Sequence, residues 1–164
     1  NFDGYEARVR NYVSQTDVYM SALIQIGVDM QKGGVMITKD PFDERNRNAV
    51  YISAVCGHNS KVVDNSGVPE QILFNPKSNS VIVMTLSQQE NALAFDENGD
   101  LKETADKCAG AKKRVLTDLQ ARSLAKAAIN IRTAFGGKKE QDIEWGILND
   151  RIYVVQSRPY IDKK

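Results

Sequence analysis

The sequence is poor in the residues that build nucleophilic or metal-thiolate sites, with two cysteines and one histidine among 164 residues. Cys56 and Cys108 have neither metal-site spacing nor the density of a secreted disulfide scaffold, which favours free thiols in a reducing compartment. A catalytic pair of Cys56 with His58 is disfavoured because Cys56 closes an apolar run and resembles a core residue. The sequence therefore offers no Cys/His or Ser/His/Asp arrangement for covalent catalysis.

The sequence also lacks an excess of one charge and any long apolar run. Its 22 basic and 21 acidic residues leave a formal charge of +1, so nothing predicts a nucleic-acid or anionic-membrane partner. No apolar run reaches the roughly 20 residues that a membrane span needs, and no signal peptide is found. We therefore expect a cytoplasmic protein. Because the first residue is Asn rather than Met, we also expect a processed chain or a piece of a longer one.

Apolar runs separated by turn residues fill most of the chain. The apolar run at 19–30 predicts a buried strand that bends at Gly27, and Gly33-Gly34 predict a turn into the next strand. The segments expected as strands are 35–38, 49–56, 71–74 and 80–84, with a further hairpin formed by 93–95 and 101–102.

Two helical patterns accompany these strands. Residues 3–15 have helical spacing, and Thr117 with Gln120 forms a capping box that begins a helix over roughly 118–135, ended by Gly136-Gly137. We expect one α+β unit with a mostly antiparallel sheet, packed helices and a closing β-hairpin.

The closing hairpin is formed by 142–147 and 152–158 around Leu-Asn-Asp-Arg. A two-residue loop, Asn149-Asp150, would bring Glu144 near Tyr153 or Val155. A three-residue loop, 149–151, would place Glu144 opposite Gln156 and Asp142 opposite Arg158. We favour the three-residue loop because it separates an apolar face from a polar one. Its apolar face would carry Ile143, Trp145, Ile147, Tyr153 and Val155.

The polar face of this hairpin suits a metal and phosphate site. The oxygens of Glu144 and Gln156 are hard ligands suited to Mg²⁺, and the Arg158 guanidinium could grip phosphate. The alternative is a solvated face on which Asp142 and Arg158 form a surface ion pair. A second, weaker phosphate-loop candidate is 57–60, which follows a predicted strand but has one glycine; a plain loop is the alternative.

Motifs along the chain resemble the ATP-binding domain of phosphoenolpyruvate synthase, pyruvate phosphate dikinase and their relatives. The specific motif is Asp-Ile-Glu-Trp at 142–145 followed by Val-Gln-Ser-Arg-Pro at 155–159. The stretches 24–41 and 54–70 are similar to further family motifs, so the resemblance covers roughly 18–160.

The resemblance implies the C-terminal lobe of an ATP-grasp fold at 18–164, preceded by an N-terminal helical segment at 1–17. It implies ATP and Mg²⁺ as cofactors, with Glu144 and Gln156 as metal ligands and Arg158 on the phosphates. Asp142 would lie beside the metal, and Gln25 would lie where adenine binds. In this family a phosphoryl group passes to a histidine of a swivelling phosphohistidine domain and then to pyruvate or another acceptor.

The resemblance also implies partners that are not in this sequence. The N-terminal ATP-grasp lobe and the phosphohistidine domain would belong to the parent chain, so the fragment alone should be inactive. The family's Gly-Leu-Gly-Glu loop is Gly57-His58-Asn59-Ser60 here. This departure motivates an alternative hypothesis, a degenerate ATP-grasp-like module that binds or interacts without catalysis.

Overall fold

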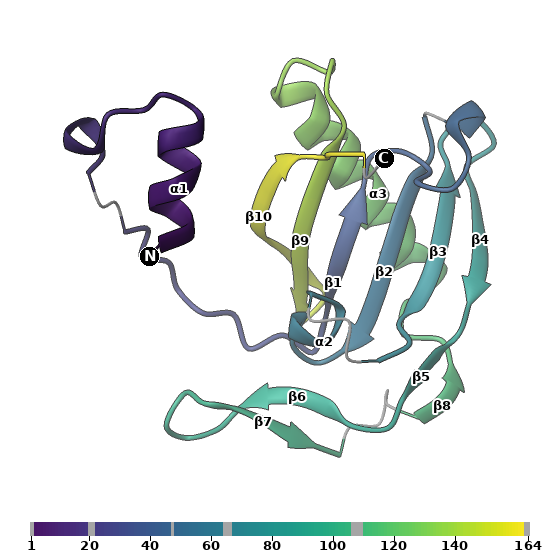
Figure 1. Ribbon diagram of the computed structural model, residues 1–164. Coiled ribbons are helices and arrows are strands. Elements are labelled where there is room, and N and C mark those ends of the chain that lie inside the picture. Colours follow the sequence, from purple (N-terminus) through teal and green to yellow (C-terminus); the bar gives the residue numbers. More distant parts are fainter. Residues whose placement is uncertain (1, 20–21, 47, 64–66, 106–109, 163–164) are drawn as a thin grey trace.

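A six-stranded antiparallel sheet forms the centre of the molecule (Figure 1). The computed structural model describes residues 2–19, 22–46, 48–63, 67–105 and 110–162. Across the sheet the strand order is β10-β9-β1-β2-β3-β4, and every neighbouring pair is antiparallel. The expected α+β class with an antiparallel sheet is confirmed. The strands are β1 (Lys32–Ile37), β2 (Val50–Cys56), β3 (Glu70–Asn75), β4 (Ser80–Thr85), β9 (Gln141–Leu148) and β10 (Arg151–Pro159).

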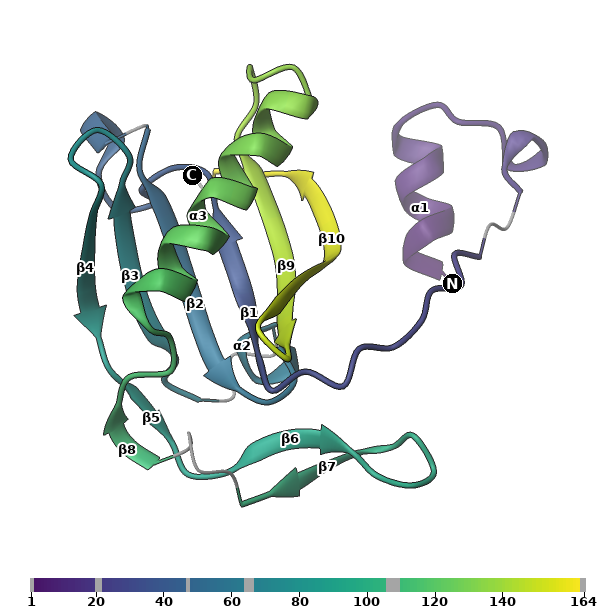
Figure 2. The ribbon, with the colours of Figure 1, turned by 180° about the vertical axis from the view of Figure 1, so that it is seen from behind.

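One long helix, α3 (Asp118–Ala134), crosses one face of this sheet (Figure 2). It begins at the predicted capping box, in which Thr117 Oγ1 accepts from the Gln120 backbone N–H and the Gln120 side chain accepts from the Thr117 N–H. Its residues Leu124 and Ala128 are fully buried. The sheet side chains that meet the helix face form the core, which includes Met36, Ile52, Ile72, Ile143 and Trp145.

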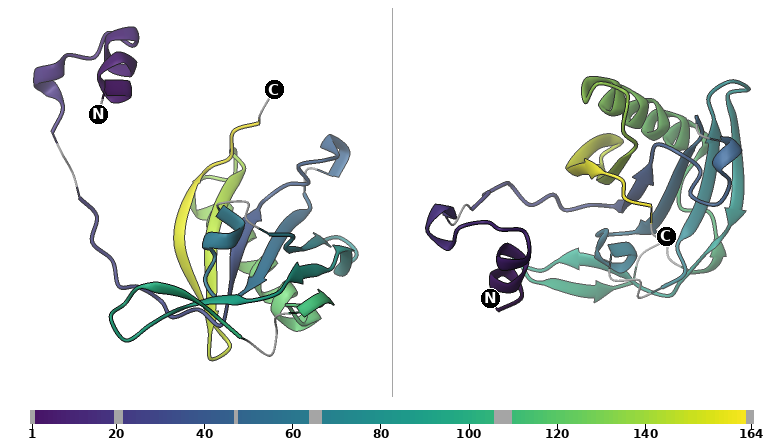
Figure 3. Two further views of the ribbon diagram at one scale, coloured as in Figure 1. Left: turned by 60° about the horizontal axis from the view of Figure 1, so that its bottom comes forward. Right: turned by 45° about the horizontal axis from the view of Figure 1, so that its top comes forward.

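Smaller elements lie at the end of the sheet where β2 finishes. The predicted hairpin is present as β6 (Ala92–Phe95) and β7 (Leu101–Thr104), and β5 (Ser87–Gln89) pairs with β8 (Gly110–Lys113). Figure 3 shows the β6–β7 hairpin extending away from the sheet. The remaining short elements are α2 (Ser60–Val63) and the 3-10 turns η1 (Gln15–Asp17) and η2 (Glu44–Asn46).

The N-terminal part forms a helix, α1 (Phe2–Arg10), set apart from the sheet and joined to it by an extended segment (Figure 3). The prediction of a buried strand at 19–30 is wrong, because the described residues of this segment form no strand. Leu23, Ile24 and Ile26 are about nine-tenths exposed (88%, 93% and 93%). Apolar composition alone does not make a strand, since a strand needs a neighbour for its backbone hydrogen bonds.

Gly33-Gly34 lie within β1 rather than in a turn before it, so that prediction is also wrong. Packing explains both glycines better than turn geometry does. A Cβ on Gly34 would lie 1.9 Å from the Ser53 carbonyl oxygen and 2.9 Å from the ring of Trp145. Gly34 therefore allows the largest core side chain, Trp145, to pack directly against β1.

Cys56 is disulfide-bonded, so the expectation of a free thiol is wrong for this residue. The same expectation for Cys108 lies outside the described residues. Among the helices that the structure describes, none has the length and apolar character needed to cross a membrane.

Candidate functional site

The closing hairpin combines a short loop with a β-bulge. Its loop is the two residues Asn149-Asp150, because Leu148 pairs with Arg151. Both loop residues are in the left-handed conformation, with φ of 51° and 58°. The predicted three-residue loop is therefore wrong. Two left-handed residues form the tight turn whose twist matches that of an antiparallel pair.

The predicted pairing of the polar residues is nevertheless confirmed, because the bulge supplies the missing residue. The register shifts between Val154 and Gln156, and beyond this point Gln156 pairs with Glu144 and Arg158 with Asp142. An extra residue in one strand changes which side chains face each other without changing the loop. All four predicted hairpin residues thus come from two adjacent strands at one end of the hairpin.

The two-residue loop also changes the predicted apolar face, because it sets the pairing between the turn and the bulge. Tyr153 pairs with Gly146, so its side chain lies on the same face as Glu144 and not with Trp145 as expected. Ile152 pairs with Ile147 and packs against the core instead. The prediction misplaced Tyr153 because the expected three-residue loop shifts the register of this part of β10 by one residue, which turns its side chains to the other face.

Asp142 and Arg158 form a charge-compensated pair. The Nε and Nη2 atoms of Arg158 each lie 2.9 Å from Oδ2 of Asp142. The Arg158 side chain remains 64% exposed, whereas that of Asp142 is 18% exposed. An exposed pair of this kind contributes about 0–1 kcal/mol, so Arg158 can exchange this carboxylate for another anion at little cost.

Glu144 has a different environment, because its hydrogen-bond donor is neutral. The Asn59 side-chain amide donates to Oε2 of Glu144 at 3.1 Å. A neutral amide orients the carboxylate and leaves its negative charge in place. Gln156, exposed and directly opposite on β10, adds an amide that could supply a second oxygen ligand.

A cation at this place would have few protein ligands. Within the described part of the chain, no group of three or more His, Cys, Asp or Glu side chains is arranged to hold a metal ion. One carboxylate and one amide oxygen instead match the few protein ligands that Mg²⁺ takes when water and phosphate oxygens complete its shell. The donor set therefore fits a nucleotide-bound Mg²⁺.

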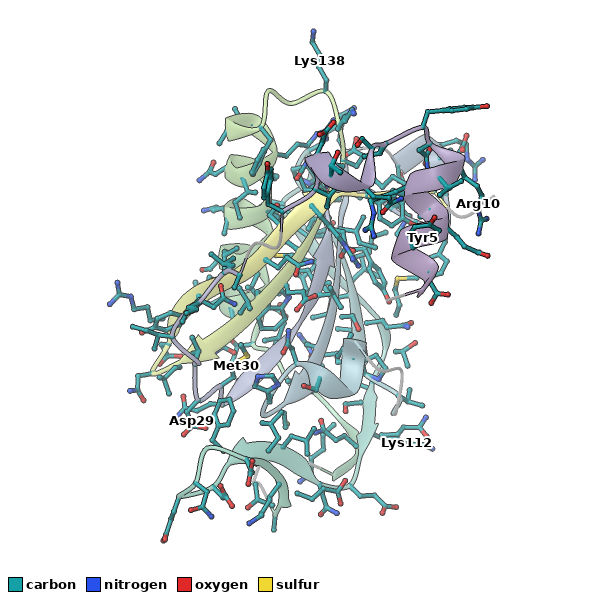
Figure 4. All side chains as sticks on the ribbon, turned by 60° about the vertical axis from the view of Figure 1, so that its left-hand side comes forward. Tyr5, Arg10, Asp29, Met30, Lys112 and Lys138 are labelled. Atoms are coloured by element: carbon teal, nitrogen blue, oxygen red, sulfur yellow. The ribbon has the colours of Figure 1, made fainter. Side chains whose placement is uncertain are left out.

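Glu144 also borders a cavity of about 640 Å³ beneath the extended segment. Figure 4 shows Asp29 and Met30 where this segment reaches the sheet. Gln25, predicted to bind adenine, lines the same cavity as Glu144, whereas Asp142, Gln156 and Arg158 are not among its lining residues. The described lining is mostly apolar and consists of Gln25, Ile26, Gly27, Val28, Met30, His58, Asn59, Ser60, Glu144, Tyr153, Val154 and Val155.

His58 is one of the residues that line this cavity. Its ring meets Phe95 edge to face at 5.4 Å between centroids, and its Nδ1 lies 2.8 Å from Ser60 Oγ. Burial lowers the pKa of the imidazole below its ordinary value of 6.5, although the carboxylates of Glu144 and Asp29 oppose this effect. The lowered pKa favours the neutral form of His58 beside the candidate metal ligand Glu144.

Asn59 is the site residue that motif analysis missed. The sequence indicates the loop 57–60 only as a backbone phosphate site, and an asparagine in a polar loop gives no pattern that would connect it with a residue 85 positions away. Its low exposure, 3%, and its contact with Glu144 become visible only in the fold.

Comparison with known proteins gives one consistent result. The family model described as the pyruvate phosphate dikinase AMP/ATP-binding domain matches residues 3–164. A probable phosphoenolpyruvate synthase of Methanocaldococcus jannaschii is 31% identical over 142 residues, covering 87% of this chain and 12% of that protein. The rifampicin phosphotransferase of Bacillus subtilis is 30% identical, covering 93% and 17%. The phosphoenolpyruvate synthase of Pyrococcus furiosus is 29% identical, covering 93% and 19%. The chain thus spans less than a fifth of the length of these relatives.

Proposed function

This chain belongs to the pyruvate phosphate dikinase AMP/ATP-binding domain family, and from that premise we propose that it is the C-terminal lobe of an ATP-grasp domain. In this proposal the lobe comprises 18–164, and 1–17 is a separate helical segment before it. The lobe binds Mg²⁺-ATP within a longer ATP-dependent phosphotransferase of the phosphoenolpyruvate synthase or pyruvate phosphate dikinase type.

The observation that carries the proposal is the pairing of Glu144 with Gln156 on one face of the closing hairpin. These two residues would hold Mg²⁺ through one carboxylate and one amide oxygen. When bound, the ion supplies charge neutralisation at the phosphate oxygens, the main requirement of phosphoryl transfer. The neutral donor on Glu144 supports this role, since an amide brings no positive charge that would compete with a cation.

Arg158, Asp142 and Gln25 take supporting roles in the proposal. Arg158 would turn from Asp142 toward the phosphates, because its side chain is exposed and its present ion pair is weak. Asp142 would hold the guanidinium in place until nucleotide arrives. Gln25 would lie beside the adenine, since it shares the mostly apolar cavity with Glu144.

The chemistry then requires parts outside this lobe. A facing N-terminal lobe would complete the nucleotide site, and a histidine on a swivelling domain would receive the phosphoryl group and pass it to a small acceptor such as pyruvate. The isolated lobe would therefore be inactive. The lengths of the relatives are consistent with such neighbours.

The test uses the intact protein that contains this chain. We expect Glu144→Ala and Gln156→Ala to abolish the labelling of a histidine from ATP while the thermal midpoint of unfolding stays within a few degrees of wild type. Glu97→Ala, an exposed glutamate at the tip of the β6–β7 hairpin, is the matched control and should label normally. Unchanged histidine labelling in Glu144→Ala refutes the site. Absence of any metal-dependent ATP binding to the wild type, measured by calorimetry, would instead favour the non-catalytic module.

A further inference from the structure

The loop 57–60 is held in place at the end of the sheet where β2 finishes. The Gly57 N–H donates to the Gln31 carbonyl at 2.9 Å, and the His58 N–H donates to the Leu93 carbonyl at 2.7 Å. Gly57 has a φ of 77°, and a Cβ there would lie 2.2 Å from the Leu93 oxygen. The loop is therefore fixed from both sides, by the segment before β1 and by β6, at a position that requires glycine.

Gly33 allows the same loop to approach β1 closely. A Cβ on Gly33 would lie 2.8 Å from the Asn59 backbone nitrogen and 3.0 Å from the Asn59 Cβ. Gly33 pairs with Gly146, the second residue after Glu144 on the neighbouring strand β9. Gly33 thus leaves the room that Asn59 needs beside β1, whereas the space over Gly146 is filled by Met30.

The resulting contact differs from the other carboxylate contact of the hairpin. The Arg158 guanidinium binds Asp142 and offsets its negative charge. The Asn59 amide, in contrast, orients the Glu144 carboxylate without bringing a positive charge. Among the described residues, Asn59 is the only hydrogen-bond donor to the Glu144 side chain, and it reaches Oε2 alone. This arrangement leaves Oε1 available to an incoming cation.

We propose that Asn59 is a positioning residue that orients the Glu144 carboxylate for the divalent cation. The inference rests on the proposed function, because it takes Glu144 as a metal ligand. Its physical basis is that a partner hydrogen-bonded to a metal-binding carboxylate fixes the orientation of that ligand before the metal binds. Asn59 itself touches neither metal nor nucleotide in this proposal.

The experiment measures metal binding rather than activity. Mn²⁺ is titrated into the intact protein with a non-hydrolysable ATP analogue, and bound Mn²⁺ is followed by electron paramagnetic resonance. We expect Asn59→Ala to raise the Mn²⁺ Kd about 10- to 100-fold, the usual range for loss of a partner behind a metal ligand. Binding of the analogue without metal should be unchanged. The matched control is Asn46→Ala, which also removes an asparagine amide from a carboxylate, that of Asp40 at 3.3 Å.

Two further variants, Asn59→Leu and Glu144→Ala, distinguish a positioning role of Asn59 from loss of packing and from failure of the metal site. Asn59→Leu keeps most of the side-chain volume, so a weakened Mn²⁺ affinity in this variant, with its thermal midpoint near wild type, supports the proposal. Mn²⁺ affinity within about twofold of wild type in a folded Asn59→Ala or Asn59→Leu protein overturns it. Glu144→Ala separates the two hypotheses. If it weakens Mn²⁺ binding and the Asn59 variants do not, only the positioning role fails; if none of them weakens it, the proposed metal site fails as well.

Discussion

Loss of the Glu70 carboxylate should remove a large part of the free energy of unfolding of this protein. Glu70 is fully buried, and its Oε2 accepts from the backbone N–H groups of Val115 at 3.0 Å and Leu116 at 2.8 Å. Its Oε1 accepts from the Arg114 guanidinium. This one side chain therefore connects β3 to the segment that leads into α3, the helix that covers the core side of β9.

The expected magnitude follows from these contacts. Glu70→Ala leaves two buried N–H groups without an acceptor, at about 1–3 kcal/mol each. The Arg114 side chain is 39% exposed and keeps its ion pair with Asp118, so the loss of its contact with Glu70 adds only about 0–1 kcal/mol. We therefore expect about 4 kcal/mol in all, a large part of the 5–15 kcal/mol typical of a domain. Glu70→Gln should cost less, because its amide oxygen can still accept from Val115 and Leu116.

Urea unfolding, followed by circular dichroism, measures these losses. Glu97→Ala is the control, because this glutamate is exposed, and it should change the free energy of unfolding by less than about 0.5 kcal/mol. A loss below about 1 kcal/mol in Glu70→Ala would contradict the reasoning, since it would mean that water replaces all three hydrogen bonds. A Glu70→Gln protein as unstable as Glu70→Ala would show that the charge, and not the acceptor geometry, matters.

Three further predictions follow from other parts of the structure. Gly34→Ala should cost about 3 kcal/mol, because its Cβ would overlap β2 and Trp145; Gly67→Ala, with no atom within 4 Å, is the control in the same urea titration. Thr117→Ala should lower the free energy of unfolding by about 1 kcal/mol through loss of the helix cap, measured in the same way. NMR titration of His58, the single histidine, should give a pKa below 6.5, and Mg²⁺-ATP should lower it further because a cation at Glu144 opposes protonation. Since the unfolded chain then binds more protons than the folded one below pH 6.5, His58 should make stability fall as the pH falls from 6.5 through its folded pKa.

The helix and most of the strands could be predicted because their signals are local. The capping box at Thr117 and Gln120 is confirmed with both hydrogen bonds, and the β3–β4 and β6–β7 hairpins occur where short apolar runs flank turn residues. In these elements, residues close in the sequence interact with one another, so composition and spacing carry the information.

The extended segment before β1 shows where this local reasoning ends. Ile24 and Ile26 have the β-branched character of a strand, yet whether a strand forms depends on a partner elsewhere. Gly34 gave a turn signal, yet it serves close packing against Trp145, a residue more than a hundred positions away. A short stretch of sequence around the extended segment or around Gly34 does not contain the distant residues on which its structure depends.

The sequence by itself determined which residues the closing hairpin brings together. The polar residues Asp142, Glu144, Gln156 and Arg158 recur at every second position, and a β-strand turns such residues to one face. The shared face within each strand was therefore predictable, whereas the pairing of Glu144 with Gln156 was predicted from a three-residue loop and is produced instead by the bulge.

Only the tertiary structure decided how that pairing is achieved and what surrounds it. The bulge after Val154 is a non-local adjustment, because it reconciles a two-residue turn with a register that β1 and the core impose on β9. The contact between Asn59 and Glu144 depends on Gly33, which lies on a third segment of the chain. Contacts among segments this distant are set by packing in three dimensions, so the sequence could indicate the ligand candidates but not the side chain that orients one of them.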